Sequence, residues 1–393
     1  MPGSLVGARV VDVTVSVAGP FASQIMGDLG ADVIKVERPP AGDDTRRWGP
    51  PFWGADSATF QGLNRNKRSL LLDLSSEEDR DILLQLATEA DVLVQNLRPG
   101  ALARLGFGYE DLRRLNPRLV YCEISGYGTT GPLSDRPAYD PLMQAFGGLM
   151  SLTGEEGRPP VRVPASILDQ GSAMWAVIGV LDALRLRDRT GEGALVQTSL
   201  LQTALMWLPP QLMGYFAAGV VPPRLGSATV GIAPYEAFPT ADGWLIVGAG
   251  NENLWQRLCR AVKRPDLLED ARFGSNPERV EHRRELHEEL AAALQHESSG
   301  HWLEVLSEHG VPVTPIQSIE EVVNHEQVAA IGAIAELEHP HLEGFRTINT
   351  PIQIDGAYYP VRRMPPAIGE HNEEIRAEVS PRRARGRPPG LRE

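Results

Sequence analysis

The sequence predicts an α/β protein whose larger part is a doubly wound, parallel sheet, with a smaller α+β domain after it. Three observations lead to this fold class. Strand and helix patterns alternate over the first 150 residues, and near Ser227 the pattern changes to a hairpin followed by helices. The length, 393 residues, suffices for two domains that each bury a core.

The first strand of the predicted sheet covers residues 9–15, and a helix follows over residues 20–30. Ser75 or Ser76 is expected to cap a helix that ends at Glu89. Further apolar runs of strand length are residues 32–37, 69–74, 91–94 and 119–125. Sheets of this kind bind ligands at the carboxyl ends of their strands. No dinucleotide fingerprint and no P-loop follows the first strand, so neither NAD nor ATP is indicated.

A lone carboxylate, Asp169, stands at the start of a long apolar helix predicted over residues 171–186. The ordinary explanation of such a residue is a helix cap, and a catalytic role is the alternative. In either case the helix N-terminus is expected to keep the carboxylate ionised.

Residues 195–223 carry no charged side chain. Polar residues and Pro209-Pro210 interrupt the segment, which argues against a membrane span and for a buried helix–loop–helix at a subunit interface. We therefore expect a soluble, cytoplasmic protein.

The smaller domain begins with a hairpin, residues 235–238 and 244–247, around the turn Thr240-Ala-Asp-Gly243. Helices are predicted at residues 252–261, 277–295 and 301–309, and short strands between residues 335 and 359. The expected division is 1–226 for the first part of the large domain, 227–331 for the small domain, 332–376 for a return segment that completes the large domain, and 377–393 for a disordered basic tail.

The net charge of −13 argues against nucleic acid or an anionic membrane as a partner. Basic residues nevertheless gather near the ends of the predicted strands, which indicates a polyanionic ligand such as a phosphorylated nucleotide: Arg38, Lys67, Arg68, Arg98 and Arg104. The two cysteines lie far apart, and every histidine stands at position 282 or later. Neither pattern predicts a metal site.

Several short motifs follow one another in a fixed order along the chain. They are Gly19-Pro20, residues 29–39, 64–69 and 91–96, Arg98-Pro99-Gly100, Ser125-Gly-Tyr-Gly128, Leu168-Asp169, Gly191-Glu-Gly193 and Gly369-Glu-His371. With these motifs the chain resembles the class III coenzyme A transferases, the CaiB/BaiF family, from Leu5 to about Ile375.

The resemblance implies a large Rossmann-like domain, a small domain, and two subunits threaded through each other as interlocked rings. It implies that Asp169 is a nucleophile that moves CoA from an acyl-CoA to a free carboxylic acid, through an aspartyl anhydride and an aspartyl-CoA thioester. CoA is then a substrate, and no permanently bound cofactor is expected. The residues that the resemblance assigns to CoA are Val17, Arg38, Leu72, Asn96, Leu97 and Arg104, and those assigned to the substrate loops are Tyr139, Gly248 and Gly250.

Some positions depart from the formyl-CoA transferases of this family. Val17 replaces a glutamine and Pro137 replaces a lysine, which weighs against formyl-CoA and oxalate as the substrate pair. The acyl donor, the acceptor acid and the pathway stay open.

Two other functions remain as alternatives. The related α-methylacyl-CoA racemases use a histidine in a Gly-His-Asp segment, where this chain has Ala138-Tyr139-Asp140. Arg385-Gly-Arg387-Pro388 resembles an AT-hook, which would bind DNA through the minor groove. The absence of histidine before His282 and the weakness of a single short motif rank both below the transferase.

Overall fold

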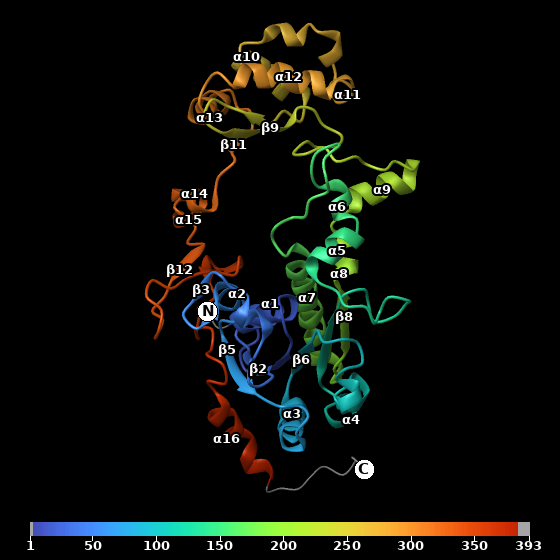
Figure 1. Cartoon of the computed structure of the whole chain (residues 1–393), viewed down its shortest axis with the longest axis vertical. Helices are drawn as coiled ribbons and strands as arrows, with labels where there is room; N and C mark the ends of the chain where they lie inside the picture. The colour runs from blue at the N-terminus through green and yellow to red at the C-terminus, as the bar shows by residue number, and fades with distance from the viewer. Residues whose placement is uncertain (1–2, 384–393) are drawn as a thin grey trace. The chain divides into compact units, whose positions relative to one another are not determined.

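The computed structural model describes residues 3–383 and is a mixed α/β protein with a parallel central sheet (Figure 1). The chain divides into two compact units. The first unit comprises Met1–Gly148, Val163–Pro209 and Ile331–Glu393, and the second comprises Leu149–Arg162 and Pro210–Ala330. Residues 149–162 and 210–226, which the sequence analysis assigned to the large domain, thus group with the second unit.

The central sheet of the first unit has six parallel strands. Their order across the sheet is β5 (Lys67–Leu71), β2 (Asp32–Glu37), β1 (Arg9–Val13), β6 (Val92–Gln95), β7 (Val120–Ser125) and β8 (Leu195–Ser199). The chain reverses its direction of winding between β1 and β6, which makes this pair the topological switch point of the sheet.

Helices cover both faces of this sheet. On one face, α3 (Glu77–Glu89), α4 (Tyr109–Leu115) and α16 (Asn372–Arg383) bury apolar side chains against the strands. On the other, α1 (Ala18–Asp28) packs on β1 and β2 and against α7 (Ile167–Thr190), which also contacts β7 and β8. By length and composition α7 would suffice to cross a membrane, and half of its apolar stretch is buried within the described protein.

Helix α16 corrects the predicted disorder of the tail for residues 377–383. Ile375 and Val379 lie one helical turn apart and enter the core of the first unit. Arg68 also holds Glu374 and Glu378 by ion pairs of 2.9 and 2.6 Å. The rest of the predicted tail, including Arg385 to Pro388, lies outside the described residues.

The uncharged segment 195–223 also differs from its prediction. It forms the edge strand β8 and two helices, α8 (Leu200–Met206) and α9 (Pro209–Ala218). No residue of α9 is buried within the single described chain, and the expected burial of this segment at a subunit interface stays a prediction. Gln197, Thr198 and Ser199 made β8 too polar to be recognised as a strand.

The second unit contains the predicted hairpin, formed by β9 (Tyr235–Pro239) and β10 (Trp244–Gly248), and β11 (Val313–Pro315) extends it to three strands. The predicted helix 277–295 is interrupted at His282. The helices around this sheet are α10 (Glu252–Ala261), α11 (Asn276–Glu281), α12 (Arg283–Leu294) and α13 (Ser299–Glu308).

Shorter elements complete the two units. In the first they are η1 (Asp44–Arg47), β3 (Phe52–Trp53), β4 (Asp56–Ser57), α2 (Ala58–Leu63), η2 (Ala103–Leu105), α5 (Asp140–Phe146), β12 (Ile334–Glu336), β13 (Arg346–Ile348), β14 (Gln353–Ile354) and β15 (Ala357–Tyr358). In the second they are α6 (Leu149–Leu152), η3 (Pro265–Leu268), η4 (Ala271–Phe273), α14 (Ile319–Val323) and α15 (Glu326–Ala330).

Candidate functional site

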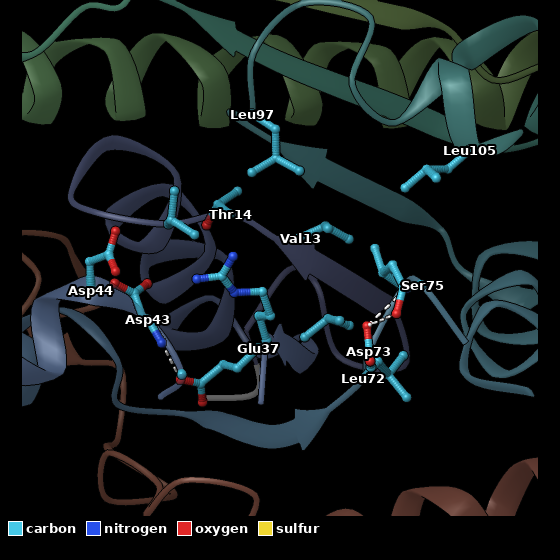
Figure 2. Close-up of a pocket in the computed structure, with 15 residues that line it drawn as sticks. Val13, Thr14, Glu37, Asp43, Asp44, Leu72, Asp73, Ser75, Leu97 and Leu105 are labelled. Atoms are coloured by element: carbon cyan, nitrogen blue, oxygen red, sulfur yellow. Dashed lines mark hydrogen bonds between the residues drawn. The ribbon is translucent and has the colours of Figure 1, made fainter. Parts of the chain in front are cut away.

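A cavity of about 640 Å³ lies at the carboxyl ends of β1, β2, β5 and β6, beside the switch point of the sheet (Figure 2). Open α/β sheets bind their ligands at this place, because successive loops diverge there and leave a crevice. The lining residues are Val13 to Val15, Val36 to Arg38, Gly42 to Asp44, Leu72 to Ser75, Leu97 and Leu105.

Three of the predicted CoA residues, Arg38, Leu72 and Leu97, line this cavity. Asn96 instead joins the loops after β1 and β6. Its amide oxygen accepts a hydrogen bond from the Val15 nitrogen at 2.9 Å, and its amide nitrogen donates to the Val15 oxygen at 2.8 Å. Arg104 is exposed in η2, next to the lining residue Leu105.

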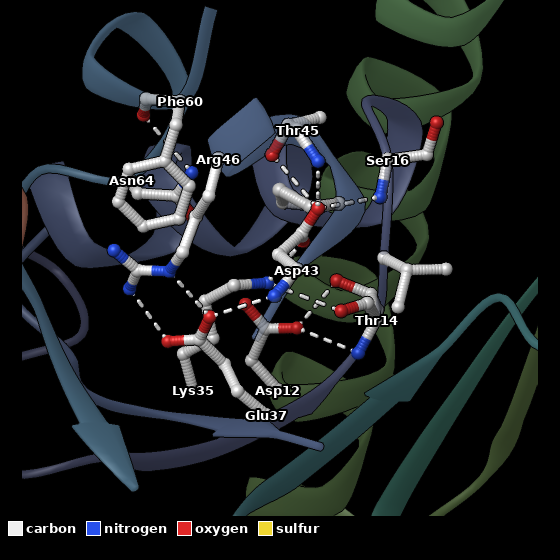
Figure 3. A network of polar contacts seen from close by, with 12 residues as sticks. Asp12, Thr14, Ser16, Lys35, Glu37, Asp43, Thr45, Arg46, Phe60 and Asn64 are labelled. Atoms are coloured by element: carbon white, nitrogen blue, oxygen red, sulfur yellow. Dashed lines mark hydrogen bonds and ion pairs between the residues drawn. The ribbon is translucent and has the colours of Figure 1, made fainter. Parts of the chain in front are cut away.

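Below the cavity, Lys35 and Asp43 form an ion pair of 2.8 Å, and both side chains are fully buried (Figure 3). The Lys35 ammonium also donates to the Thr14 carbonyl at 3.1 Å, so one cation holds two segments of the cavity wall. Burial alone would raise the pKa of Asp43, but the charge of Lys35 and the hydrogen bonds from Lys35 and Thr45 together outweigh burial and lower that pKa. Asp43 therefore stays ionised and paired.

A second buried pair neutralises Glu37, which ends β2 and lines the cavity. Arg46 donates to both Glu37 carboxylate oxygens at 2.7 Å and to Asp56 at 2.9 Å. Its guanidinium lies 3.7 Å from the centre of the Phe60 ring. Because Arg46 compensates the negative charges of Glu37 and Asp56, these carboxylates repel an anionic ligand less than two unpaired carboxylates would.

Lys67 and Arg68 do not contribute to the predicted anion site. Lys67 is fully buried and bonds to Asp12 at 3.2 Å, and Arg68 is paired with Asp32 at 2.6 Å as well as with α16. Burial lowers the pKa of Lys67 to about 8. Both residues lie at the amino end of β5, whereas the cavity lies at the carboxyl ends of the strands. Their charges therefore pair with residues of the core and do not face the cavity.

Asp169 is the third residue of α7, near the helix N-terminus as predicted, but it does not cap the helix. The cap is Asp140, whose Oδ2 accepts hydrogen bonds from the backbone nitrogens of Leu168 at 2.7 Å and of Asp169 at 3.2 Å. Ser166, at the N-cap position, makes no capping bond with its side chain. Within residues 3–383 the Asp169 carboxylate itself has no hydrogen-bond or ion-pair partner, so the helix-cap explanation of this residue is wrong.

The expectation that the helix N-terminus keeps the Asp169 carboxylate ionised also needs correction. Burial and, second, the negative charge of Asp140 raise the pKa of Asp169 to about 7. The helix N-terminus does not outweigh these two effects. The carboxylate is ionised above about pH 7 and increasingly protonated below it.

The cavity and Asp169 are connected through the packing of two helices. The loop after β1 lines the cavity and leads to Val17, which is buried at the N-cap position of α1. Helix α1 in turn packs along α7, the helix that carries Asp169.

The remaining predicted site residues belong to other elements of the chain. Tyr139 is exposed immediately before α5. Gly248 and Gly250 belong to the second unit, where a Cβ atom on Gly248 would stand 2.3 Å from the Tyr235 ring, so that a larger residue would have to displace this ring. Residues 3–383 contain no group of three or more histidine, cysteine or acidic residues that could hold a metal ion.

Comparison with known proteins gives consistent matches over nearly the whole chain. The model of CoA-transferase family III matches residues 5–372. The succinyl-CoA:glutarate CoA-transferase of Mus musculus is 38% identical over 375 residues, which cover 95% of this chain and 86% of that protein. The acetyl-CoA:oxalate CoA-transferase of Acetobacter aceti is 38% identical and covers 96% of both chains.

Solved structures agree with these matches. A CaiB/BaiF family protein from Brucella suis superposes with a TM-score of 0.88 at 36% identity, covering 96% of this chain and all of that one. A hypothetical protein from Mycobacterium tuberculosis gives a TM-score of 0.84 at 32% identity, covering 95% of this chain and 99% of that one.

Proposed function

Since the chain belongs to CoA-transferase family III and is an acyl-CoA:carboxylate CoA-transferase, we propose that Asp169 is its nucleophile and that CoA occupies the cavity at the switch point. One observation carries the proposal most directly. Asp169 stands at the start of a helix that another carboxylate already caps, and its own oxygens are unpaired within residues 3–383. Such a carboxylate is free to attack.

The reaction needs only the two substrates and this carboxylate. An Asp169 oxygen attacks the thioester carbonyl of the donor, the carbon–sulfur bond breaks, and a mixed anhydride and the CoA thiolate result. The thiolate then attacks the Asp169 carbonyl and releases the donor acid, which leaves an aspartyl-CoA thioester. Holding the reactants in place makes each attack effectively intramolecular.

The acceptor acid completes the cycle by the same chemistry in reverse. Its carboxylate attacks the aspartyl thioester, which frees the thiolate and forms a second anhydride. The thiolate attacks the acyl carbonyl of the acceptor, giving the new acyl-CoA and restoring Asp169. The energy of the thioester bond is conserved throughout, so no ATP is consumed.

We propose dicarboxylic acids as the acceptors to which this enzyme transfers CoA. The proposal is supported by the names of its relatives, which include transferases for succinyl-CoA with glutarate, D-citramalate or mesaconate, and for acetyl-CoA with oxalate. The test is a matrix of succinyl-CoA and acetyl-CoA against these acids and matched monocarboxylates, with new acyl-CoA measured by chromatography. Faster transfer to monocarboxylates than to every dicarboxylate would contradict this assignment.

Arg38 is expected to bind CoA without taking part in the chemistry. It lines the cavity, and its side chain has no ion-pair partner within residues 3–383. Arg38→Ala should raise KM for acyl-CoA about tenfold and leave kcat within a few-fold, because a phosphate contact is made equally in ground and transition states. Arg114→Ala, which removes an exposed arginine on α4, is the control and should change neither constant. A large fall in kcat at unchanged KM would show that Arg38 acts in another way.

We further propose an interlocked homodimer. Exposed apolar side chains support it: Leu142 and Phe146 on α5, Met174 and Ile178 on α7, Leu205 and Met206 on α8, and, in the second unit, Met213, Tyr215 and Phe216 on α9. Apolar surface of this extent is typical of a subunit interface. Light scattering should give twice the chain mass of 42.9 kDa at all concentrations at which the protein stays folded. A folded, active monomer would contradict interlocking.

A further inference from the structure

Asp140 differs from the other buried carboxylates of the first unit. Asp12, Glu37 and Asp43 each bond to a buried lysine or arginine. Asp140 is only 2% exposed, yet no cation within residues 3–383 lies at ion-pair distance from it. Its partners are neutral donors, namely the two backbone nitrogens at the start of α7 and the Gln144 amide, which donates to Oδ1 at 2.5 Å.

Capping alone does not require a charge at this position. Asparagine and serine cap helices about as well as aspartate, and a buried carboxylate without a cation costs free energy of desolvation. A neutral cap would hold Leu168 and Asp169 with less penalty. The charge of Asp140 therefore calls for a function that a neutral cap does not serve.

We propose that Asp140 is a positioning residue that fixes the backbone of Asp169 at the start of α7 and holds a negative charge beside the attacking carboxylate. Its Oδ2 bonds directly to the Asp169 nitrogen, so geometry and charge act on the same residue. The inference rests on the proposed role of Asp169 and assigns to Asp140 the control of its reactivity.

Within residues 3–383, the helices and strands that pack against α7 offer no other charged group for this role. The helix packs against α1, α5, α8, β7 and β8. Neither α8 nor β8 contains a charged residue, and the one charged residue of α1, Asp28, is bound to Arg65 at 2.6 Å. Glu123 of β7 accepts hydrogen bonds from Gln95 and Gln197. The remaining charge is that of Asp140 on α5. It raises the pKa of Asp169, and only burial has a larger effect on that pKa.

The chemical consequence is a more basic nucleophile. A carboxylate whose ionised form is destabilised by a like charge forms a bond to an acyl carbon more readily, and the same effect makes its proton harder to remove. Asp140 thus favours attack on the thioester but requires a pH near or above the pKa of Asp169. Removing the charge should weaken the nucleophile and widen the range of pH in which it is ionised.

The test is the pH profile of kcat/KM in two neutral variants, Asp140→Asn and Asp140→Ser. Wild-type activity should be lost as the pH falls through about 7. In both variants this acid limb should move to lower pH by about one unit or more, because the like charge is gone. It should stay above about pH 4, the ordinary value for aspartate, because burial remains. The plateau kcat should fall at least several-fold in both.

Two neutral variants are needed because the asparagine amide nitrogen would face the Gln144 amide nitrogen, a conflict that serine avoids. Ser166→Ala is the matched control at the N-cap of α7, and it should leave profile and rate unchanged, since Ser166 makes no capping bond with its side chain. Thermal unfolding should show that all three variants are folded.

An acid limb that stays at the wild-type pH in both folded variants would overturn the proposal for Asp140. Failure of the proposed function looks different. In that case Asp169→Ala retains transfer and shows the wild-type profile, whatever the Asp140 variants do.

Discussion

Replacing Asp169 with alanine is expected to lower the rate of CoA transfer by roughly 10³-fold or more, since no other group supplies the carboxylate that forms the covalent intermediates. Asp169→Asn should lose as much, because the amide is isosteric but is not a comparable nucleophile. Both variants should still fold and bind CoA, because Asp140 caps α7 and the cavity does not include Asp169. Initial rates and equilibrium binding of CoA measure the two properties separately.

Asp182→Ala is the matched control for this loss. Asp182 lies on the same helix but is exposed, and it is expected to have no role in the reaction. Its variant should keep the wild-type rate. If Asp169→Ala transferred CoA at a rate comparable to that of Asp182→Ala, the nucleophile would have to be another residue.

Replacing Lys35 with methionine is expected to produce the largest loss of stability among single changes near the cavity. The substitution removes the cation from Asp43 and leaves a buried, unpaired carboxylate, which typically costs about 3–5 kcal/mol in the free energy of unfolding. Because Thr14 and Asp43 both bond to Lys35 and both line the cavity, the KM for acyl-CoA should rise as well. Urea unfolding at fixed protein concentration, with one acyl-CoA titration, measures both effects.

The neighbouring pair Arg47–Asp44 supplies the control. Its ion pair of 3.4 Å joins side chains that are 64% and 63% exposed, and so water screens it. Arg47→Met should therefore change the free energy of unfolding by less than about 1 kcal/mol. Equal losses in Lys35→Met and Arg47→Met would show that the buried pair does not support the cavity wall.

The strands that build the sheet could be predicted because burial on both faces leaves nearly continuous apolar runs. Residues 32–37 form β2 with the predicted bounds, and the remaining predicted strands differ by a few residues at their ends. The edge strand β8 was missed since one side of it has no neighbouring strand and tolerates polar residues. The part of the tail that continues α16 was missed because the contacts of Glu378 and Val379 are with distant parts of the chain.

The candidate site was predictable only in part, for a similar reason. The apolar residues around Lys35 in β2 indicate from the sequence alone that this charge is buried. Which residue pairs with it, Asp43, is determined by the fold and could not be predicted. Asp140 gave no such sign, because its hydrogen bonds join residues 28 and 29 positions apart. Lys67 and Arg68 were assigned to the ligand because they stand near a strand end, although residues that precede a strand lie at its amino end, away from the carboxyl ends at which such sheets bind ligands.

The most direct test of this account is to trap the acyl group or CoA on the enzyme. Purified protein is incubated with succinyl-CoA or acetyl-CoA, treated with hydroxylamine or borohydride, digested, and examined by mass spectrometry. The account predicts one modified peptide in the wild type, with the modification at Asp169 as the hydroxamate or the reduced side chain, and none in Asp169→Asn. An enzyme that transfers CoA rapidly but yields no modification at Asp169, or yields it at another carboxylate, would contradict the proposed mechanism.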